Sequence, residues 1–379
     1  MEPFQKVKNW FLDSGLLIDN ENDANFGGVH AFFDEKKNEF GFIYPEITGY
    51  AISTLRFLYD IEKNDHYLEL AKQSSDWLIS LYENHGGIIQ RVDYEQNKTK
   101  LAYAFDTGIC AKGLLDCYHM TEEKKYLYAS QKLLDWLVDG ALENDGTIKP
   151  FKNLSTNKFE SSNKYWYTQK GCLHIKTAIP FFQLYEITKN DDLLKHAICI
   201  SNAYEKFIQL DGSIKLHLQE NIIHLHSLCY ALEGLLHAYH ITHDKKYLIK
   251  SKEALKWCNS KILSDGSIFL WYNSNYPQAK TSYHVAQLIR LMMLVDKVND
   301  TMEWSESIDR LNYFLLSLQA DSDDSRINGG FYEENYKSFL GWKKRKKVNS
   351  WGSMFALEAL YWKDNYTNLS FESIIKFLF

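Results

Sequence analysis

The sequence predicts an all-α fold in which six helical hairpins close into an (α/α)6 toroid, with short β-hairpins on one face. The first observation behind this prediction is a small glycine turn that recurs six times, at intervals of roughly sixty residues. The turns are Gly27-Gly28, Gly86-Gly87, Asp145-Gly146, Asp211-Gly212, Asp265-Gly266 and Gly329-Gly330. Because glycine supplies the positive φ of a tight hairpin, the apolar residue after each turn is expected to begin a short strand. These apolar residues are Val29, Ile88, Ile148, Ile214, Ile268 and Phe331.

The second observation is that the helical segments between the turns alternate between two compositions. One member of each pair is amphipathic and highly charged, which is typical of an outer helix with one face in solvent. These segments are Pro3–Leu17, His66–Tyr82, Lys124–Val138, Asp192–Ile208, Lys246–Cys258 and Glu303–Leu318. The other member has few charges, so it is expected in a buried inner ring. These segments are Glu46–Tyr59, Asp106–Met120, Gly171–Ile187, His226–Ile241, Tyr283–Val295 and Trp351–Tyr361.

The connections between the helices also alternate. Short turns such as Lys63–Asp65 join an inner helix to the next outer helix, as antiparallel neighbours require. Each return to the next inner helix is a long segment that carries a glycine turn, so all six long segments are expected on one face, where binding and chemistry usually occur. No Pro/Gly/Ser-rich linker interrupts the array, and residues 371–379 are apolar enough for an extra helix. We therefore expect one domain over residues 1–379.

The composition argues against several classes of partner. The 379 residues carry a net charge of −6 with a pI near 6.1, so no global basic field is available to bind nucleic acid. The N-terminus lacks the apolar core of a signal peptide, and no window approaches about eighteen consecutive apolar residues. We therefore expect a cytoplasmic protein that does not insert into a membrane.

Cysteine spacing and nucleotide motifs point away from metals and cofactors. The cysteines at 110, 117, 172, 199, 229 and 258 are scattered and form no CxxC pair, so neither disulfides nor a zinc site are expected. No GxGxxG, P-loop or GxSxG element lies in a workable context. We therefore expect no cofactor and no bound metal.

Two carboxylates stand in the first turns of the first two inner helices. Glu46 lies between Tyr44 and Tyr50, and Asp106 follows Phe105. If the inner helices run parallel in a ring, these side chains converge with six helix N-termini, whose dipoles favour a negative group. An aromatic, partly dry setting raises the pKa of a carboxyl group and allows it to act as an acid. The alternative interpretation is that both carboxylates only cap their helices.

Histidines supply further candidates near the starts of the inner helices. His174, His226 and His284 each stand in otherwise apolar sequence, where a histidine is often a satisfied core residue. As a group they are candidates for positioning substrate or sharing proton transfer. His224 precedes His226 by two residues, so both face one side only if a strand continues there. No HxxxH or HExxH spacing supports a metal site.

Aromatic and basic residues complete the predicted site. Aromatic residues form 15% of the chain, and those near the inner N-termini either pack between helices or stack on sugar rings. The substrate-binding candidates are Tyr44, Tyr50, Arg91, Tyr165, Trp166, Tyr167, His224, Trp271, Tyr283 and Trp351. The run Lys343–Lys347 precedes the last inner helix, where it forms either a solvated loop or a cationic rim for a charged glycan.

Several stretches resemble the six-hairpin glycosidase-like (α/α)6 toroid superfamily. Residues 113–118 and 232–239 carry the general likeness, which spans nearly the whole chain. More specifically, YPEITGY at 44–50 and FDTG at 105–108 resemble motifs of uncharacterised surface-polysaccharide-associated proteins related to glucuronyl C5-epimerase C-terminal domains. The segment 106–108 also resembles the region of an active-site aspartate in unsaturated glucuronyl hydrolases. That resemblance implies an acid/base role for Asp106.

These observations lead us to expect a carbohydrate-active enzyme whose partner is an anionic, uronic-acid-containing oligo- or polysaccharide. The first expectation is a glycoside hydrolase in which Glu46 and Asp106 perform acid/base catalysis in an aromatic funnel. The alternatives are a C5-uronyl or 2-epimerase, a polysaccharide lyase, and a non-catalytic glycan-binding or assembly protein of surface polysaccharide synthesis. A homodimer is the oligomer we consider. A toroid acting on isoprenoids is disfavoured because DSDD at 321–324 falls on a loop.

Overall fold

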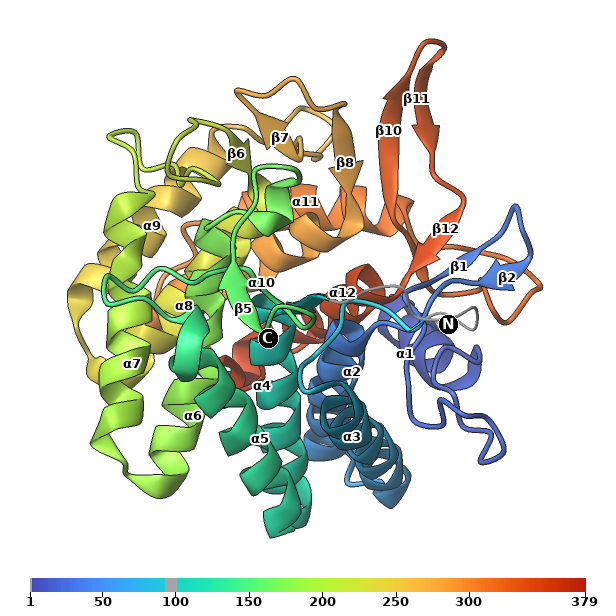
Figure 1. Ribbon diagram of the computed structural model, residues 1–379. Helices are drawn as coiled ribbons and strands as arrows, with labels where there is room; N and C mark the ends of the chain where they lie inside the picture. The colour runs from blue at the N-terminus through green and yellow to red at the C-terminus, as the bar shows by residue number, and fades with distance from the viewer. Residues whose placement is uncertain (1, 93–100) are drawn as a thin grey trace. The chain divides into compact units, whose positions relative to one another are not determined.

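The computed structural model describes residues 2–92 and 101–379 and is drawn in Figure 1. The chain divides into two compact units. The first unit comprises Leu17–His30, Phe42–Lys206 and Phe379. The second unit comprises Met1–Leu16, Ala31–Gly41 and Phe207–Leu378. The expectation of one domain over the whole chain stays a prediction.

The first unit contains three of the expected helical hairpins (Figure 1). They are α2 (Pro45–Glu62) with α3 (Asp65–His85), α4 (Ala104–Thr121) with α5 (Lys124–Trp136), and α6 (Ala178–Thr188) with α7 (Asp191–Asn202). A π-helical turn covers Leu137–Ala141, and 3-10 turns cover Trp166–Thr168, Cys172–Thr177 and Ala203–Lys206. The antiparallel strands Leu101–Tyr103 (β3), Phe151–Asn153 (β4) and Lys158–Glu160 (β5) form a sheet in that order. Because α4 packs against both α2 and α6, the helices with few charges lie on the inside, as predicted.

The second unit contains three more hairpins, the last of which pairs two distant segments. They are α8 (Leu225–Thr242) with α9 (Lys245–Asn259), α10 (Ser282–Asn299) with α11 (Ser305–Ser317), and α12 (Ser350–Asp364) with α1 (Pro3–Asp13). A 3-10 turn at Tyr366–Asn368 and α13 (Phe371–Ile375) follow. α10 packs between α8 and α12, so this unit repeats the arrangement of the first.

Short antiparallel sheets precede the inner helices of the second unit. One has the order β2-β1-β12-β9, another the order β11-β10-β8, and a third pairs β6 with β7. The strands are β1 (Phe32–Asp34), β2 (Glu39–Phe40), β6 (Ile223–His224), β7 (Trp271–Tyr272), β8 (Ala279–Thr281), β9 (Phe331–Tyr332), β10 (Glu334–Ser338), β11 (Gly341–Lys344) and β12 (Lys347–Asn349). In β6 and β7, His224 stands opposite Trp271, and this register fixes two of the candidate residues.

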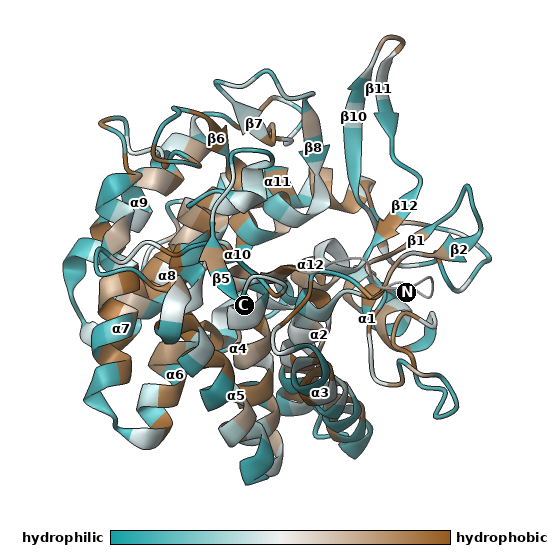
Figure 2. Ribbon diagram, viewed as in Figure 1, coloured by the Kyte–Doolittle hydropathy of each residue, from teal (hydrophilic) through white to brown (hydrophobic). Residues whose placement is uncertain are grey.

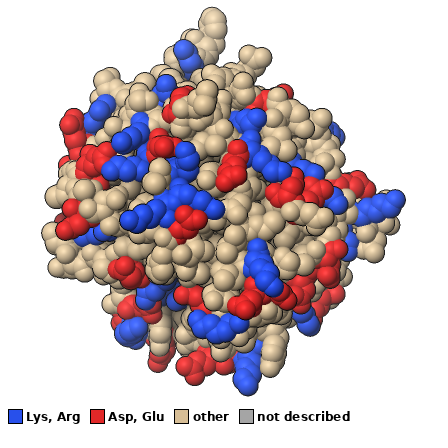
Figure 3. Space-filling model, turned by 90° about the vertical axis from the view of Figure 1, so that its left-hand side faces the viewer, with Lys and Arg blue, Asp and Glu red and all other residues tan. Residues whose placement is uncertain are grey.

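Burial follows the predicted alternation of inner and outer helices. In α4 every residue from Ala104 to Cys117 is buried, whereas α5 buries only one face. Figure 2 shows α7 largely hydrophilic and α8 largely hydrophobic. On the face drawn in Figure 3, acidic and basic side chains are interspersed without a large patch of one sign. Among the described residues, no helix is both long and apolar enough to span a bilayer.

Several helix boundaries differ from the expectation; for example, α7 ends at Asn202 rather than Ile208, and α10 ends at Asn299 rather than Val295. Two of the differences have identifiable reasons. The first outer helix ends at Asp13 rather than Leu17, because Gly15 adopts a φ of 82° soon after it. The third inner helix begins as a 3-10 turn over Cys172–Thr177, and α6 starts only at Ala178. Pro180 occupies the first turn of α6, where its missing amide hydrogen removes no helical bond.

Of the six strands expected after the glycine turns, one forms, and three further positions form only isolated β-bridges. Phe331 lies in β9, and Val29, Ile148 and Ile214 form isolated β-bridges. Ile88 and Ile268 lie in no strand or bridge among the described residues, so the strand prediction is wrong there. At Ile268 the carbonyl oxygen instead accepts a bond from the His284 ring.

Most of the repeated glycines have positive φ and pack directly on the outer helix of the hairpin they introduce. At Gly266, φ is 76° and an added Cβ would lie 2.0 Å from the backbone oxygen of Arg310 on α11. The corresponding distances to backbone oxygens are 2.3 Å from Gly27 to Gln73, 2.1 Å from Gly146 to Cys199, 2.9 Å from Gly212 to Glu253 and 2.3 Å from Gly329 to Lys6. Each turn therefore needs glycine both for its backbone angle and for its contact.

Gly86 departs from this pattern and provides a matched comparison. It ends α3 with a φ of 69°, and no described atom lies within 4 Å of an added Cβ. We expect Gly266→Ala to lower the free energy of unfolding by about 2–4 kcal/mol, because left-handed strain and a backbone clash combine. Gly86→Ala is expected to cost only about 1 kcal/mol, from the backbone angle alone. Urea denaturation of both variants measures the difference, and equal losses would contradict the packing role.

Candidate functional site

Glu46 lies in the first turn of α2, as the sequence predicts. Pro45 occupies the opening position of the helix, where its fixed φ suits a helix start. The Glu46 side chain is buried, and this burial raises the pKa of its carboxyl group. Hydrogen bonding to Tyr44, the charge of Lys176 and hydrogen bonding to Tyr50 act in the opposite direction on that pKa. Glu46 is therefore a buried carboxyl group with partners that favour its ionised form.

Asp106 lies in the equivalent turn of α4 and has fewer supporting partners. Its side chain is 4% exposed, and its Oδ2 atom makes no hydrogen bond with any described residue. Burial and the charge of Glu46 raise the pKa of Asp106 well above its usual value. Capping satisfies a carboxylate through helix amides, so a buried oxygen left without a partner indicates more than a capping role.

Close helix contacts bring these two carboxyl groups together. A Cβ on Gly49 would lie 2.9 Å from the backbone oxygen of Ile109, and one on Gly113 would lie 2.7 Å from the oxygen of Gly49. The backbones of α2 and α4 therefore touch, as Gly49 in the first motif permits. A Cβ on Gly108 would lie 2.9 Å from Cγ2 of Thr177, which holds the 3-10 turn over Cys172–Thr177 against the start of α4.

Lys176, in that 3-10 turn, is the cation of this group, and sequence reasoning missed it. The side chain is fully buried, and its Nζ donates to the hydroxyl of Tyr50 at 3.3 Å. The same Nζ lies 4.8 Å from the centre of the Tyr50 ring. The available signal was the one lysine in the segment 171–187, where Glu186 is the only other charged residue of the sequence. Glu46, Asp106 and Lys176 thus form a carboxyl pair with one adjacent ammonium group.

A second buried charge cluster joins α2 and α4 further along the helices. Lys112 donates to Asp116 at 2.6 Å and to Ser53 at 3.2 Å, and Arg56 pairs with Asp116 at 2.6 Å. Burial raises the pKa of Asp116, but the charges of Lys112 and Arg56 outweigh it and hold that pKa at about 2. This cluster joins the two helices that carry Glu46 and Asp106.

The depressed pKa of Asp116 predicts how stability depends on pH. Because the folded value lies below the unfolded one, the contribution is complete above about pH 4 and is lost as the pH falls through about 2. We expect Lys112→Met to lower the free energy of unfolding by about 2 kcal/mol at pH 7. Urea denaturation between pH 2 and 7 should show this loss shrinking toward low pH.

The matched control for this prediction is Lys132→Met. Lys132 lies 4.0 Å from Glu83 in an exposed pair. Its replacement is expected to change stability by less than about 1 kcal/mol at any pH. A loss at Lys112→Met that stays constant from pH 7 to pH 2 would contradict the assignment.

Aromatic candidates of the first unit form a stack beside the carboxyl pair. Tyr165 stacks on Tyr167 with ring centres 5.4 Å apart, and Trp166 meets the same ring edge-on at 5.6 Å. Tyr103, which sequence reasoning missed, lies 6.1 Å from Tyr167. Burial is the largest reason that the pKa of Tyr103 is raised, and the neighbouring Tyr167 and Asp106 raise it further. Because the charge of Asp106 acts on Tyr103, this end of the stack lies near Asp106.

Two further candidates of the first unit accompany the stack. The Arg91 guanidinium lies 4.8 Å over the ring of Phe42. His174 is buried, with its ring edge-on to Phe105 at 6.2 Å. The first-unit candidates therefore lie in the first two turns of α2 and α4 or in the segments that lead into α2, α4 and α6.

The second unit gathers its own candidates around His226 at the start of α8. The His226 ring centre lies 4.2 Å from that of Tyr230 and 4.5 Å from that of Tyr283. Trp351 lies 5.9 Å from Tyr283. We describe this group as the His226 cluster. It is aromatic on several sides and contains one basic ring.

His224, Trp271 and His284 are more strongly committed to internal contacts. His224 stacks on Trp271 at 4.2 Å, and Trp271 also stacks on Tyr276 at 4.4 Å. One ring nitrogen of His284 bonds to Thr281 at 2.5 Å and the other to the carbonyl of Ile268 at 3.1 Å. Burial lowers the pKa of His284 to about 3. Because both ring nitrogens of His284 already bond to protein atoms, we propose no catalytic role for His284.

The carboxylates beside the His226 cluster were not among the residues predicted from the sequence. Burial and the charge of Glu334 raise the pKa of Glu333 to about 7. The pKa of Tyr283 is also raised, chiefly by burial and then by the charge of Glu333. Arg345, from the basic run, pairs with Glu334 at 2.6 Å. Lys346 pairs with Glu35 at 3.1 Å. The basic run is thus partly neutralised within the second unit.

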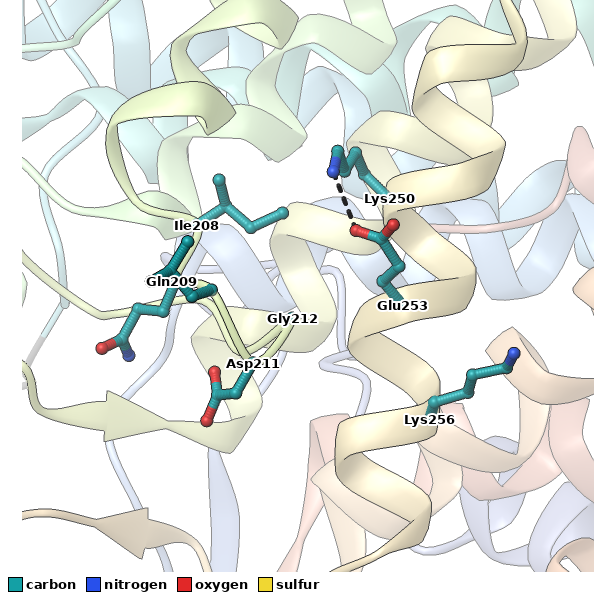
Figure 4. Close-up of a pocket in the computed structure, with 8 residues that line it drawn as sticks. Ile208, Gln209, Asp211, Gly212, Lys250, Glu253 and Lys256 are labelled. Atoms are coloured by element: carbon teal, nitrogen blue, oxygen red, sulfur yellow. Dashed lines mark hydrogen bonds and ion pairs between the residues drawn. The ribbon is translucent and has the colours of Figure 1, made fainter.

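A separate surface hollow holds none of the candidates. Figure 4 shows it between the fourth glycine turn and α9, and Lys250 and Glu253, both on α9, pair with each other at 2.8 Å along one wall. The other lining residues are Ile208, Gln209, Leu210, Asp211, Gly212 and Lys256. Within residues 2–92 and 101–379, no three histidine, cysteine or acidic side chains are grouped so that they could bind a metal ion.

Comparisons with known proteins add the following findings. The family model described as glycosyl hydrolase family 76 matches residues 47–224. A search of curated protein sequences gives no significant match. Solved structures resemble nearly the whole chain. A cellobiose 2-epimerase from Bacillus thermoamylovorans is 15% identical, with a TM-score of 0.74 and coverage of 94% of this chain and 98% of its own.

Two hydrolases are similar to the chain at comparable coverage. An unsaturated glucuronyl hydrolase specific for heparin is 10% identical, with a TM-score of 0.69 over 97% of this chain and 98% of its own. An alpha-1,6-mannanase of Salegentibacter sp., in complex with alpha-1,6-mannotetrose, is 12% identical, with a TM-score of 0.64 over 95% of this chain and 99% of its own.

The mannanase comparison also marks a difference. That structure is an inactive variant with two consecutive aspartates replaced by alanine. Within residues 47–224, the consecutive aspartates of this chain are Asp191 and Asp192. Both are exposed at the start of the outer helix α7, and Asp192 pairs with Lys195 at 2.8 Å. The buried carboxyl pair of this chain comes from two different inner helices instead.

These comparisons decide the fold. At identities of 10–15% over nearly complete chains, they show a common architecture and leave the reaction open. The predicted (α/α)6 fold of six helical hairpins is confirmed. The chain has the (α/α)6 fold of six helical hairpins that it shares with these solved structures.

Proposed function

We propose that this protein is a carbohydrate-active enzyme, and specifically a glycoside hydrolase whose acid and base are Asp106 and Glu46. The observation that carries the proposal is the buried carboxyl pair at the starts of α2 and α4. Glycoside hydrolysis requires one carboxyl group that donates a proton to the leaving oxygen and one carboxylate that activates water or attacks the sugar. The similarity to glycosyl hydrolase family 76 over residues 47–224 supports this class.

The surroundings of the pair divide the two roles. Lys176, Tyr44 and Tyr50 favour the ionised form of Glu46 and so counteract the burial that raises its pKa. Asp106 is buried beside the charge of Glu46, which raises the pKa of Asp106 further. As the pH rises, the first proton therefore leaves chiefly from Glu46, and Asp106 keeps its proton. Two carboxyl groups whose environments separate their pKa values are typical of an acid and base pair.

The residues around the pair support an acidic glycan as the substrate. Aromatic rings at Tyr103, Tyr165 and Tyr167 offer faces for sugar rings. Arg91 and Lys176 supply positive charge, and helix N-termini add to it. We therefore propose a uronic-acid-containing oligo- or polysaccharide, with neutral mannose-containing glycans as the first comparison.

Epimerisation is the second candidate function, favoured by the ammonium group beside the pair. A base that removes a proton α to a carbonyl or carboxylate needs a nearby positive group to stabilise the enolate that forms. The charge of the buried Lys176, which acts on Glu46, supports this candidate. In this reaction Glu46 would accept the proton and Asp106 would return one.

The test is a panel of glycans incubated in deuterated water with the native protein, Glu46→Gln and Asp106→Asn. The panel contains uronic-acid oligosaccharides, alpha-1,6-mannotetrose and cellobiose, and products are read by mass spectrometry and NMR. Shortened chains formed only by the native protein would establish hydrolysis or, with a new double bond, elimination. Deuterium on carbon without cleavage would establish epimerisation.

One control variant and one binding measurement make the panel decisive. The double variant Asp191→Asn Asp192→Asn removes the exposed consecutive aspartates and is expected to keep full activity. If the double variant loses activity while Asp106→Asn keeps it, the assignment of Glu46 and Asp106 as the catalytic pair is wrong. No turnover across the panel, with binding of a glycan retained by every variant, would instead favour a non-catalytic glycan-binding protein.

A further inference from the structure

A stack of three aromatic rings in the second unit runs from the interior to the surface. Trp271 in β7 stacks on His224 with ring centres 4.2 Å apart and on Tyr276 with ring centres 4.4 Å apart. His224 is 3% exposed and Trp271 7%, whereas Tyr276 is 43% exposed. Nδ1 of His224 lies 2.8 Å from the hydroxyl of Ser227, which fixes the buried end of the stack. The stack therefore presents a tyrosine ring to solvent on a fixed base.

The loop between β7 and β8, which carries Tyr276, is held by local contacts. The hydroxyl of Ser274 accepts a hydrogen bond from the backbone N–H of Tyr276 at 3.0 Å. Pro277 follows and disfavours a helical backbone at Tyr276. The side-chain nitrogen of Gln278 donates to the backbone oxygen of Trp271 at 3.0 Å, which closes the loop on β7. A ring held in advance loses little conformational entropy when a ligand covers it.

A second exposed ring stands on the long ribbon formed by β10 and β11 (Figure 1). Trp342 in β11 is 40% exposed and stacks on Phe269 with ring centres 5.9 Å apart. The Nζ atom of Lys280 lies 4.7 Å from the centre of the Trp342 ring and pairs with Asp265 at 2.8 Å. Lys337 is exposed and stands directly opposite Trp342 in the ribbon, so the two side chains share a face. Positive charge therefore accompanies this ring.

Flat exposed rings with polar neighbours match the chemistry of a sugar. The C–H groups on one face of a sugar ring pack against an aromatic face, whereas its hydroxyl groups need hydrogen-bonding partners. Asn275, next to Tyr276, is exposed, and an amide both donates to and accepts from hydroxyl groups. Lys337 beside Trp342 offers a charge to a carboxylate on the sugar.

We propose that Tyr276 and Trp342 form a glycan-binding surface of the second unit, on which two sugar units of one chain stack. Their supporting rings, Phe269 and Trp271, are two residues apart, so the Cα atoms of these two are separated by at most about 7 Å. Such a surface assigns an oligo- or polysaccharide rather than a monosaccharide as the ligand. The choice of a uronic-acid chain rests on the proposed function, whereas the stacking on the two rings does not.

The test is isothermal titration calorimetry with a hexasaccharide of galacturonic acid, in the Asp106→Asn background so that the ligand is not consumed. Tyr276→Ala and Trp342→Ala are each expected to raise Kd about tenfold, a typical loss for an aromatic side chain central to a binding surface. Tyr276→Phe keeps the ring and should bind like its parent. Tyr276→Leu keeps an apolar cover on Trp271 without a flat ring, so it should bind as weakly as Tyr276→Ala.

The matched control is Tyr313→Ala, which removes a tyrosine that is 76% exposed on the outer helix α11. This variant should leave Kd unchanged. Thermal unfolding confirms that each variant is folded. The same titrations with alpha-1,6-mannotetrose test a neutral chain. If only that chain binds, and the same variants weaken it, the stacking surface stands and the uronic acid is wrong.

Binding and turnover separate this inference from the proposed function. If the native protein cleaves the hexasaccharide while Tyr276→Ala and Trp342→Ala leave Kd and KM unchanged, the inference is wrong and the proposed function stands. If both variants weaken binding but no glycan is turned over, the hydrolase is wrong and the glycan-binding surface stands. A parent protein that binds neither chain, or a Tyr276→Leu variant that binds like its parent, overturns the inference.

Discussion

Replacing Asp106 by asparagine is expected to lower kcat/KM for a natural glycan about a thousandfold. This loss lies within the range of about 10²- to 10⁴-fold that a general acid contributes. A thousandfold loss corresponds to about 4 kcal/mol of transition-state stabilisation. The physical reason is that asparagine keeps the shape of Asp106 but cannot protonate the leaving oxygen. The measurement is the steady-state rate on the substrate that the panel identifies.

Leaving-group chemistry separates the role of Asp106 from that of Glu46. An aryl glycoside with a strongly acidic phenol departs without protonation, so Asp106→Asn should cleave it at close to the native rate in the bond-breaking step. Glu46→Gln should remain slow on the same compound, because it lacks the base or nucleophile that both substrates need. Equal impairment of Asp106→Asn on both substrates would contradict its role as the acid.

The pH profile provides an independent check on the same pair. Activity requires Glu46 ionised and Asp106 protonated, so the native rate should fall at low pH with Glu46 and at high pH with Asp106. Burial raises the pKa of both groups, which moves the window toward neutral pH relative to ordinary carboxyl groups. Asp106→Asn should lose the high-pH fall and keep the low-pH one. A native profile that is flat across neutral pH would argue against the pair.

Removing Arg290 is expected to have the largest effect on stability. Arg290 is fully buried, pairs with Glu233 at 3.0 Å and with Glu358, and lies 4.6 Å over the ring of Phe355. Arg290→Met would leave two buried carboxylates without their cation, at a cost of about 3–5 kcal/mol. Urea denaturation at pH 7 measures this loss in the free energy of unfolding.

Two comparisons identify the cause of that loss. Lys63→Met removes an exposed partner of Asp60 at 3.3 Å and should cost less than about 1 kcal/mol. Adding Glu233→Gln and Glu358→Gln to Arg290→Met removes the buried charges and should recover a large part of the lost stability. If the triple variant is no more stable than Arg290→Met, lost packing against Phe355 rather than uncompensated charge explains the effect.

The fold could be predicted because its causes are local and repeated. The six glycine turns are visible in sequence, because positive φ favours glycine at all six and a close backbone contact also requires it at five of them. Inner and outer helices could be told apart because burial on all sides removes charge from α4 but leaves it on α5. The exact ends of the helices were harder to predict from the sequence. Pro180 and Gly15 shift two boundaries by a few residues.

The candidate site could be predicted only where position along a helix determined it. Glu46 and Asp106 stand in first turns, so their location followed from the fold. Lys176 and Glu333 were missed because their importance comes from neighbours distant in sequence, such as Tyr50 and Arg345. His284 illustrates the converse. Its sequence setting matches that of His226, but a threonine and a carbonyl oxygen occupy its two nitrogens.

The contact between a glycine turn and the outer helix of its own hairpin has a consequence for how this architecture can diversify. At five of the six turns, both ends of the segment that follows are anchored, one on the outer helix at Gly266 or its counterparts and the other at the start of an inner helix. Insertions and exchanges within that segment leave both anchors in place. Substitutions and insertions can therefore change the binding surface one hairpin at a time. Related chains can differ in chemistry while the packing of their helices stays the same.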